Sequence, residues 1–275
     1  MTGMNLRANF HTHTCLCDGA DTPEDMVRAA LEKGFDHLGF SGHVDLSPTM
    51  DIPAYQKEIR RLQQKYAGQI EILLGGEFDL IFPHPEISGF EYRIGSCHYV
   101  EPAGEPIPVD LSAEMLEKAL KEYYGGDGYA LCRDYYRREA MVAERLSCDV
   151  IGHFDLILKY NGELGFVEED DPRYLGPAME TLEVLTGCGA AFEINTRQIR
   201  RGRMYPARRL LRQLREWKAE LLISSDAHRA EELDHGFAEA AALAADCGFD
   251  HVNGLTVKEG KPVLYPIGLA KEGQR

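Results

Sequence analysis

Residues 7–13 read RANFHTH, a short predicted strand that ends in His11 and His13. Residues two apart on a strand face the same side, so both imidazoles can reach one ion. Six further strands are predicted near residues 37–41, 70–75, 92–96, 149–153, 190–195 and 220–225. Potential metal ligands stand at the ends of most of them: His43 in HLGFSGH, Glu77 in IEILLGGEFD, His98 in YRIGSCH, His153 in DVIGHFD, and Asp226 and His228 in LLISSDAH. We expect these side chains to meet at one face, because α/β folds place catalytic groups at strand ends.

Helical patterns alternate with these strands, which predicts parallel βα units and an α/β fold class. Thr22 and Pro23 mark the start of the first helix, and later helices are expected at about 54–68, 112–124, 131–147, 174–187, 206–218 and 231–247. The length of 275 residues suits one α/β barrel of about 250 residues. We therefore expect a single barrel domain over residues 1–275, with a helical insertion at about 100–147. Residues 250–255 could complete the ring or cap an irregular one.

The composition limits which kinds of binding partner and which cellular compartment we expect for the protein. The net charge of −15 argues against nucleic acid, which selects basic surfaces. No run of 18 apolar residues predicts a membrane span. The seven cysteines contain no CxxC pair and favour a reducing compartment. We expect a cytoplasmic protein that binds neither nucleic acid nor membrane; the oligomeric state is not encoded in any pattern that we recognise.

A metal centre is the simplest reading of so many histidines at strand ends. One HxH pair is weak evidence, but each further strand end with a ligand makes a set of structural histidines harder to sustain. Asp18 is either a ligand or a turn residue before Gly19. Cys15 and Cys17 alternate with the first histidines and are alternative thiolate ligands. The other histidines, at positions 37, 235 and 251, are expected to be structural or exposed.

The ordered set HTH…D, SGH, GGEFD, GSCH, GHFD and SSDAH resembles the polymerase and histidinol phosphatase (PHP) superfamily of metallophosphoesterases. Within it the chain is most similar to monofunctional histidinol-phosphatases, which share its length and a segment like EINT…R at 193–200. The motifs span residues 11–228. This resemblance implies a distorted (β/α)7 barrel with parallel strands and outer helices. It also implies three divalent metal ions, for which Zn, Mn and Fe are all candidates.

The resemblance also implies how the ligands are shared, motif by motif. The three expected groups are His11, His13, Glu77 and Asp226; then Glu77 as a bridge with His98 and His153; then Asp18, His43 and His228. Glu77, Asp226 and His228 are the expected catalytic residues. Three divalent ions are only partly neutralised by these carboxylates, so such a site favours an oxyanion.

Phosphate-binding residues are less clearly marked. Arg200 matches the arginine after the EINT motif, Arg197 lies three residues earlier, and Lys159 follows GHFDLIL. His84, soon after Glu77, could line the substrate pocket. The alternative for the arginines is a solvated basic loop.

The function implied by the resemblance is hydrolysis of L-histidinol phosphate to L-histidinol and phosphate, a step of histidine biosynthesis, by attack of a metal-bridging hydroxide. The alternatives are a PHP phosphoesterase for nucleotides, phosphotyrosine protein or another phosphomonoester, an amidohydrolase-like metallohydrolase, and a non-catalytic scaffold. An amidohydrolase usually bridges its metals with a modified lysine, where this chain offers Glu77. A scaffold would be expected to lack some of the ligands.

Overall fold

The computed structural model describes residues 6–45, 50–82 and 87–269. Its main sheet follows the order β1-β2-β4-β5-β8-β9-β10-β11-β12, with β3 beside β4. The strands of this sheet are β1 (Ala8–Asn9), β2 (His37–Phe40), β3 (His43–Val44), β4 (Glu71–Asp79), β5 (Tyr92–Ser96), β8 (Val150–Ile151), β9 (Ala191–Asn195), β10 (Leu221–Ser224), β11 (His251–Lys258) and β12 (Lys261–Gly268). All neighbours from β1 to β11 pair in parallel, as predicted.

The two ends of the parallel sheet meet beyond the carboxyl ends of β1 and β10. Thr12 forms a parallel bridge with Ala227. The His13 N–H donates to the Ala227 carbonyl at 2.8 Å, and the Ala227 N–H donates to the His11 carbonyl at 3.2 Å. The bridge brings the first and last ligand segments into backbone contact.

Apolar side chains from strands all around the sheet pack against one another in one cluster, which is the arrangement of a barrel interior. The cluster contains Ala8, Phe10, Leu73, Tyr92, Ile94, Val150, Ala191, Leu222 and Leu255. Tyr92 crosses it, and its hydroxyl donates to the carbonyls of Phe10 and Phe40. Gly75 leaves room for this ring, because a Cβ there would lie 2.2 Å from the Tyr92 Cζ.

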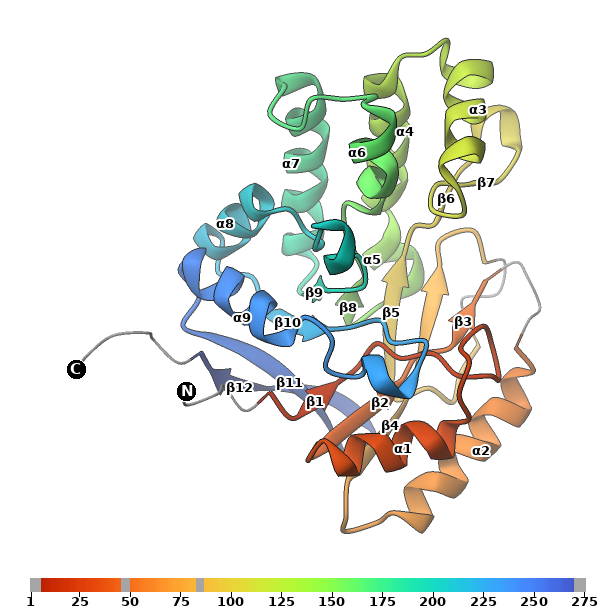
Figure 1. The fold of residues 1–275 in the computed structure, drawn as a ribbon, viewed down its shortest axis with the longest axis vertical. Coiled ribbons are helices and arrows are strands. Elements are labelled where there is room, and N and C mark those ends of the chain that lie inside the picture. Colours follow the sequence, from red (N-terminus) through yellow and green to blue (C-terminus); the bar gives the residue numbers. More distant parts are fainter. Residues whose placement is uncertain (1–5, 46–49, 83–86, 270–275) are drawn as a thin grey trace.

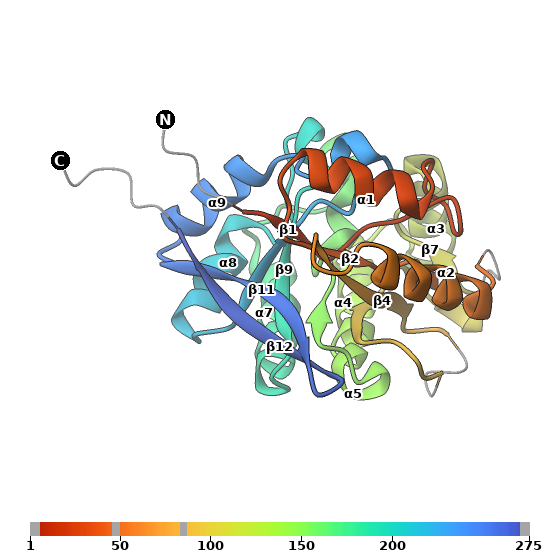
Figure 2. The ribbon, with the colours of Figure 1, turned by 90° about the horizontal axis from the view of Figure 1, so that it is seen from below.

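The helices lie around the strands (Figures 1 and 2). They are α1 (Pro23–Glu32), α2 (Ile52–Lys65), α3 (Ala113–Tyr124), α4 (Gly128–Glu139), α5 (Val142–Leu146), α6 (Asn161–Leu164), α7 (Pro172–Gly187), α8 (Arg208–Glu216) and α9 (Phe237–Asp246). Thr22 caps α1 by accepting the Asp25 N–H, as predicted. No helix within the described ranges is long and apolar enough to cross a bilayer.

Two predicted helices have different limits in the structure. The segment expected at 131–147 is divided into α4 and α5 by a turn at Ala140 and Met141, which no glycine or proline marks. The segment expected at 231–247 becomes a helix only from Phe237. Gly236 precedes that residue with a φ of +73°, a conformation that glycine adopts without strain and that interrupts a helix.

The last hairpin caps the amino-terminal end of the sheet. β11 pairs in parallel with β10, and β12 returns antiparallel to β11. The Thr256 hydroxyl donates to Glu71 at 2.6 Å, and the Tyr265 hydroxyl lies 3.0 Å from His37 Nδ1. Both contacts reach the first residues of parallel strands, so the hairpin covers the end opposite the predicted ligands. Within 250–255, Asn253 pairs with Leu222 of β10 and Leu255 joins the inner apolar cluster. The contact between Tyr265 and His37 is consistent with the predicted structural role of His37.

Between β5 and β8 the chain makes its longest excursion from the sheet. A small hairpin of β6 (Tyr99–Val100) and β7 (Ile107–Pro108) leads into α3, α4 and α5. Of these helices, α3 and α4 stand at one end of the molecule, whereas α5 lies closer to the strands (Figure 1). The division of residues 1–275 into one domain with an insertion at about 100–147 stays a prediction.

Candidate metal centre

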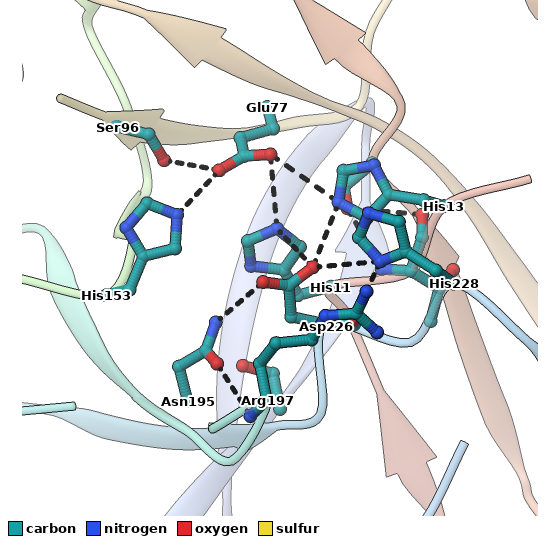
Figure 3. Close-up of polar contacts among 12 residues, drawn as sticks. His11, His13, Glu77, Ser96, His153, Asn195, Arg197, Asp226 and His228 are labelled. Carbon is teal, nitrogen blue, oxygen red and sulfur yellow. Dashed lines mark hydrogen bonds and ion pairs between the residues drawn. The ribbon is translucent and has the colours of Figure 1, made fainter. Parts of the chain in front are cut away.

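The predicted ligands come together where the parallel strands end. His11 and His13 follow β1, Glu77 lies in β4, and Asp226 follows β10. His43, in β3, pairs with Glu77 in register. The remaining ligands reach the same place: His98 after β5, His153 after β8, His228 after β10, and Asp18 from the loop before α1. Figure 3 shows several of these side chains turned toward one another from separate strands.

Four atoms of the first predicted group converge. His11 Nε2 lies 3.3 Å from Glu77 Oε2 and 3.7 Å from Asp226 Oδ1. His13 Nε2 lies 3.5 Å and 3.2 Å from the same two oxygens. Donor atoms that share a tetrahedral Zn²⁺ at 2.0–2.2 Å stand about 3.4 Å apart. The spacing therefore fits a common divalent ion.

The burial of these four atoms is a second argument for an ion at this position. Within the described parts of the chain, none of these four atoms has a hydrogen-bond partner, although all are buried. A buried polar atom without a partner is costly. Three such atoms belong to side chains that are at most 1% exposed. A cation at their centre would satisfy all four lone pairs at once.

Glu77 connects this group to a second one. Its other oxygen, Oε1, lies 2.9 Å from His153 Nε2 and 3.3 Å from His98 Nε2. The Ser96 hydroxyl donates to the same oxygen at 2.7 Å. The two carboxylate oxygens thus face different histidine sets, as the bridging role requires (Figure 3).

The third group surrounds Asp18. His228 Nε2 lies 3.1 Å and His43 Nε2 lies 3.4 Å from Asp18 Oδ2. His13 Nδ1 faces Asp18 Oδ1 at 3.4 Å, so His13 stands between the first and third groups. A neutral imidazole has one lone pair and one N–H. With Nε2 assigned to the first group, Nδ1–H faces Asp18. Asp18 thus lies among three of the predicted histidine ligands, and its role as a ligand stays a prediction.

The carboxylates and histidines of this cluster shift one another's pKa values. Burial raises the pKa of Glu77, but the charges of His11, His98 and His43 outweigh it and hold that pKa well below its usual range. Burial lowers the pKa of His11, yet the charges of Glu193, Asp226 and Glu77 raise it well above 6.5. Without metal, protons on the histidines balance the carboxylates; a metal ion would replace those protons.

Two carboxylates behind the ligands were missed by the sequence analysis as functional residues. Glu193 of β9 accepts from His11 Nδ1 at 2.9 and 3.1 Å, and from the His153 N–H at 2.8 Å. Asp79 of β4 lies 2.9 Å from His98 Nδ1. The two Nδ1 contacts direct the Nε2 lone pairs of His11 and His98 toward the centre. A sequence signal for Glu193 was available, because AFEIN places a charged residue within an otherwise apolar predicted strand.

Asp226 is held in a special conformation. Its φ is +50°, a left-handed value that is uncommon outside glycine. The Asn195 side-chain amide donates to its Oδ2 at 3.3 Å, which leaves Oδ1 to face His11 and His13. Strained backbone of this kind is a recurrent feature of functional sites.

The predicted phosphate-binding residues lie differently from one another. The Arg197 side chain extends toward the side of the cluster that holds Asp226 and His228 (Figure 3), and its guanidinium lies 3.0 Å from Glu232. Arg200 is 69% exposed at its side chain and lies 3.9 Å from Glu232. Lys159 pairs with Asp110 at 3.3 Å. His84 lies outside the described residues. The phosphate-binding roles of all four stay predictions.

The remaining cysteine and histidine candidates are consistent with minor roles. Cys17 Sγ lies 3.7 Å from His13 Nδ1 and 3.4 Å from the Thr14 carbonyl, whereas Cys15 is exposed. In the described parts of the chain, neither thiol is among the histidine, aspartate and glutamate side chains whose donor atoms lie close enough together to hold a metal ion. His251 pairs with Asp250 at the surface.

We expect Glu193→Gln to weaken metal binding by roughly 10- to 100-fold, because the substitution removes the carboxylate that orients His11. Metal content after dialysis against graded chelator measures the effect. Glu183→Gln, at an exposed position of α7, is the matched control. Unchanged metal retention in a folded Glu193→Gln protein would show that His11 needs no such support.

Comparison with known proteins agrees with this geometry. A family model described as PHP domain matches residues 9–197. A "Probable histidinol-phosphatase" of Deinococcus radiodurans is 34% identical over 270 residues, covering 90% of this chain and 95% of the relative. Another protein of that name, from Schizosaccharomyces pombe, is 31% identical and covers 89% of this chain and 87% of its own length.

Solved structures share the fold. The histidinol phosphate phosphatase of Lactococcus lactis, crystallised with zinc, L-histidinol and phosphate, has a TM-score of 0.67 at 20% identity and covers 94% of this chain and 98% of its own. A structure from Listeria monocytogenes has a TM-score of 0.74 at 22% identity, covering 84% and 99%. The predicted α/β fold class is thereby confirmed.

Proposed function

The chain belongs to the PHP domain family, and from this premise we propose that it is a phosphomonoesterase that hydrolyses L-histidinol phosphate to L-histidinol and phosphate. The observation that supports the proposal is the convergence of the predicted ligands at the ends of the parallel strands, where one buried atom each of His11, His13, Glu77 and Asp226 has no hydrogen-bond partner within the described residues. Two relatives that are more than 30% identical, and that match this chain over most of their length, carry the name probable histidinol-phosphatase. Histidine biosynthesis in the cytoplasm is the corresponding setting.

Bound divalent ions would supply an activated water and neutralise charge on the phosphoryl oxygens. The chain's own residues provide the arrangement. Glu77 presents one oxygen to each of two ligand groups, and Asp226 is aimed by Asn195. His228 is oriented by its Nδ1, which lies 2.9 Å from the Asp226 carbonyl, so that Nε2 faces Asp18. Glu77, Asp226 and His228 remain our candidates for the residues closest to the reacting group.

A small-molecule substrate suits the acidic character of the chain, whose net charge of −15 disfavours a nucleic-acid partner. The motif set likewise favours phosphomonoester hydrolysis over amide hydrolysis, because Glu77 takes the bridging position. We propose that nucleotides and phosphotyrosine proteins are poor substrates. Another small phosphomonoester is the remaining candidate within the family.

A substrate panel tests the assignment. We expect kcat/KM for L-histidinol phosphate to exceed that for nucleoside monophosphates, phosphoserine and phosphotyrosine by at least about tenfold, which corresponds to about 1.4 kcal/mol of transition-state binding. Phosphate release by protein with measured metal content is the readout. If a nucleotide or phosphotyrosine leads by that margin, the family stands and the biosynthetic assignment falls.

The arginines near Glu232 are expected to anchor phosphate. Arg200→Ala and Arg197→Ala should each raise KM by roughly tenfold while metal content is retained, because a charge-assisted contact to the phosphoryl group is lost. Arg209→Ala, on the exposed face of α8, is the control. Normal turnover and binding by Arg200→Ala would assign that residue to a solvated basic loop, which its exposure also allows.

A further inference from the structure

The β6–β7 hairpin brings Asp110 beside the second ligand group. Tyr99 pairs with Pro108, and the Val109 N–H donates to the carbonyl of His98 at 2.9 Å. Asp110 follows Val109 directly, so its position is tied by backbone hydrogen bonds to a predicted metal ligand. Sequence separation conceals this proximity, because Asp110 ends a hairpin that has no ligand of its own.

Asp110 is paired with a cation that comes from the neighbouring strand end. Lys159 stands six residues after His153, in a helical turn over Leu156–Tyr160, and its Nζ lies 3.3 Å from Asp110 Oδ2. The Tyr160 hydroxyl donates to the Asp110 backbone carbonyl at 2.8 Å. The ion pair therefore bridges the segments that follow β5 and β8, which also carry His98 and His153.

Partial exposure allows a ligand to replace the contact between Lys159 and Asp110. The Lys159 and Asp110 side chains are 17% and 28% exposed, so a ligand can reach both. A phosphomonoester of a 2-amino alcohol carries one anionic and one cationic group, two carbons apart. Such a ligand can give Lys159 a phosphoryl oxygen and give Asp110 an ammonium, so that neither side chain is left without a counter-charge.

Other carboxylates near the strand ends are less suited to an ammonium group. Glu232 lies between two arginines, at 3.0 Å from Arg197 and 3.9 Å from Arg200, and has a surplus of positive charge around it. Glu101 is engaged by Arg138. Among the residues that the structure describes, Asp110 forms its ion pair with Lys159, and that lysine is itself a candidate phosphate ligand.

We propose that Asp110 determines specificity by binding the ammonium group of a 2-aminoalkyl phosphate, with Lys159 as its partner in the free protein and a contact of the phosphoryl group in the complex. This inference rests on the proposed phosphatase activity. It adds the group that distinguishes an aminated phosphomonoester from a neutral one.

The test compares metal-loaded wild-type and Asp110→Asn proteins on two matched pairs of substrates. The first pair is L-histidinol phosphate and 3-(imidazol-4-yl)propyl phosphate, which lacks the amine. The second is 2-aminoethyl phosphate and ethyl phosphate. Asparagine keeps the size of the side chain and the backbone carbonyl that Tyr160 binds. Glu101→Gln, on the same excursion of the chain, is the matched control.

We expect Asp110→Asn to lower kcat/KM for the aminated member of each pair by roughly 10- to 100-fold, as loss of a charged hydrogen bond does, and to change the other member less than about twofold. Glu101→Gln should keep the wild-type ratio. An equal loss on both members would make Asp110 a positioning residue for Lys159 and overturn the inference. A wild-type enzyme without preference for the amine would also overturn it.

Failure of the proposed substrate has a different signature. If wild-type protein prefers 2-aminoethyl phosphate to L-histidinol phosphate, and Asp110→Asn abolishes its preference for the amine, the histidinol assignment falls while the role of Asp110 stands.

Discussion

The Glu77→Gln protein is expected to retain less than about a thousandth of the wild-type kcat and to lose metal from two of the three ligand groups. Glu77 Oε2 faces His11 and His13, and Oε1 faces His98 and His153, so one carboxylate serves both groups. The amide carries no charge and cannot bridge two cations. Loss of water activation and of charge neutralisation, each worth several kcal/mol, explains the size of the effect.

Elemental analysis of freshly purified protein, together with single-turnover phosphate release, measures both consequences. Glu71→Gln is the matched control, because Glu71 lies on the same strand at the end remote from the ligands and contacts His37 and Thr256. The metal-centre assignment would be wrong if Glu77→Gln folded normally and kept full metal content and activity.

Removal of the metals should be equally severe and should be reversible. We expect chelated protein to lose activity by about a thousandfold or more and to unfold roughly 10 °C lower. A ligand present at a thousand times its Kd stabilises a protein by about 4 kcal/mol, and each kcal/mol shifts the unfolding temperature by about 2–4 °C at this size. Readdition of Zn²⁺ or Mn²⁺ should restore both properties. Calorimetry and phosphate release, before and after chelation, test this expectation.

Reactivation should depend on pH with a defined sign. The pKa values of His11 and His98 are raised in the metal-free protein: burial lowers each, but neighbouring carboxylates outweigh it. Above the ordinary pKa of 6.5 these imidazoles therefore still hold protons that a metal must displace. Raising the pH from about 6 to 8 should lower the metal concentration needed for half-reactivation. A pH-independent requirement would show that these histidines are not ligands.

Much of the centre was predictable because its ligands obey local rules. Parallel strands end at one edge, so the sequence alone places HTH, SGH, GGEFD and SSDAH on one face. The same reasoning located β1, β2, β4, β5, β8, β9 and β10 to within a few residues, since each is a short apolar run followed by polar residues. The short strands β3, β6 and β7 were not predicted. The signal of Thr22 and Pro23 for the start of α1 is equally local.

Features that depend on packing were not predictable in the same way. The division of α4 from α5 carries no glycine or proline, and the start of α9 at Phe237 depends on the conformation of Gly236. The supporting carboxylates Glu193 and Asp79 were not identified, because their function lies in contacts with histidines from other strands.

The sequence by itself determined the α/β class and the parallel pairing of the strands, and it predicted nine metal ligands, because strand periodicity and ligand chemistry are properties of short segments. Tertiary structure alone decided which donor atoms lie close enough to share an ion, that His13 stands between two groups, and that the last hairpin extends from β10 over the amino-terminal end of the sheet. It also decided that Asp110 lies beside His98. These facts depend on distances between residues far apart in the chain, and such distances are set only when the strands and the hairpins pack together.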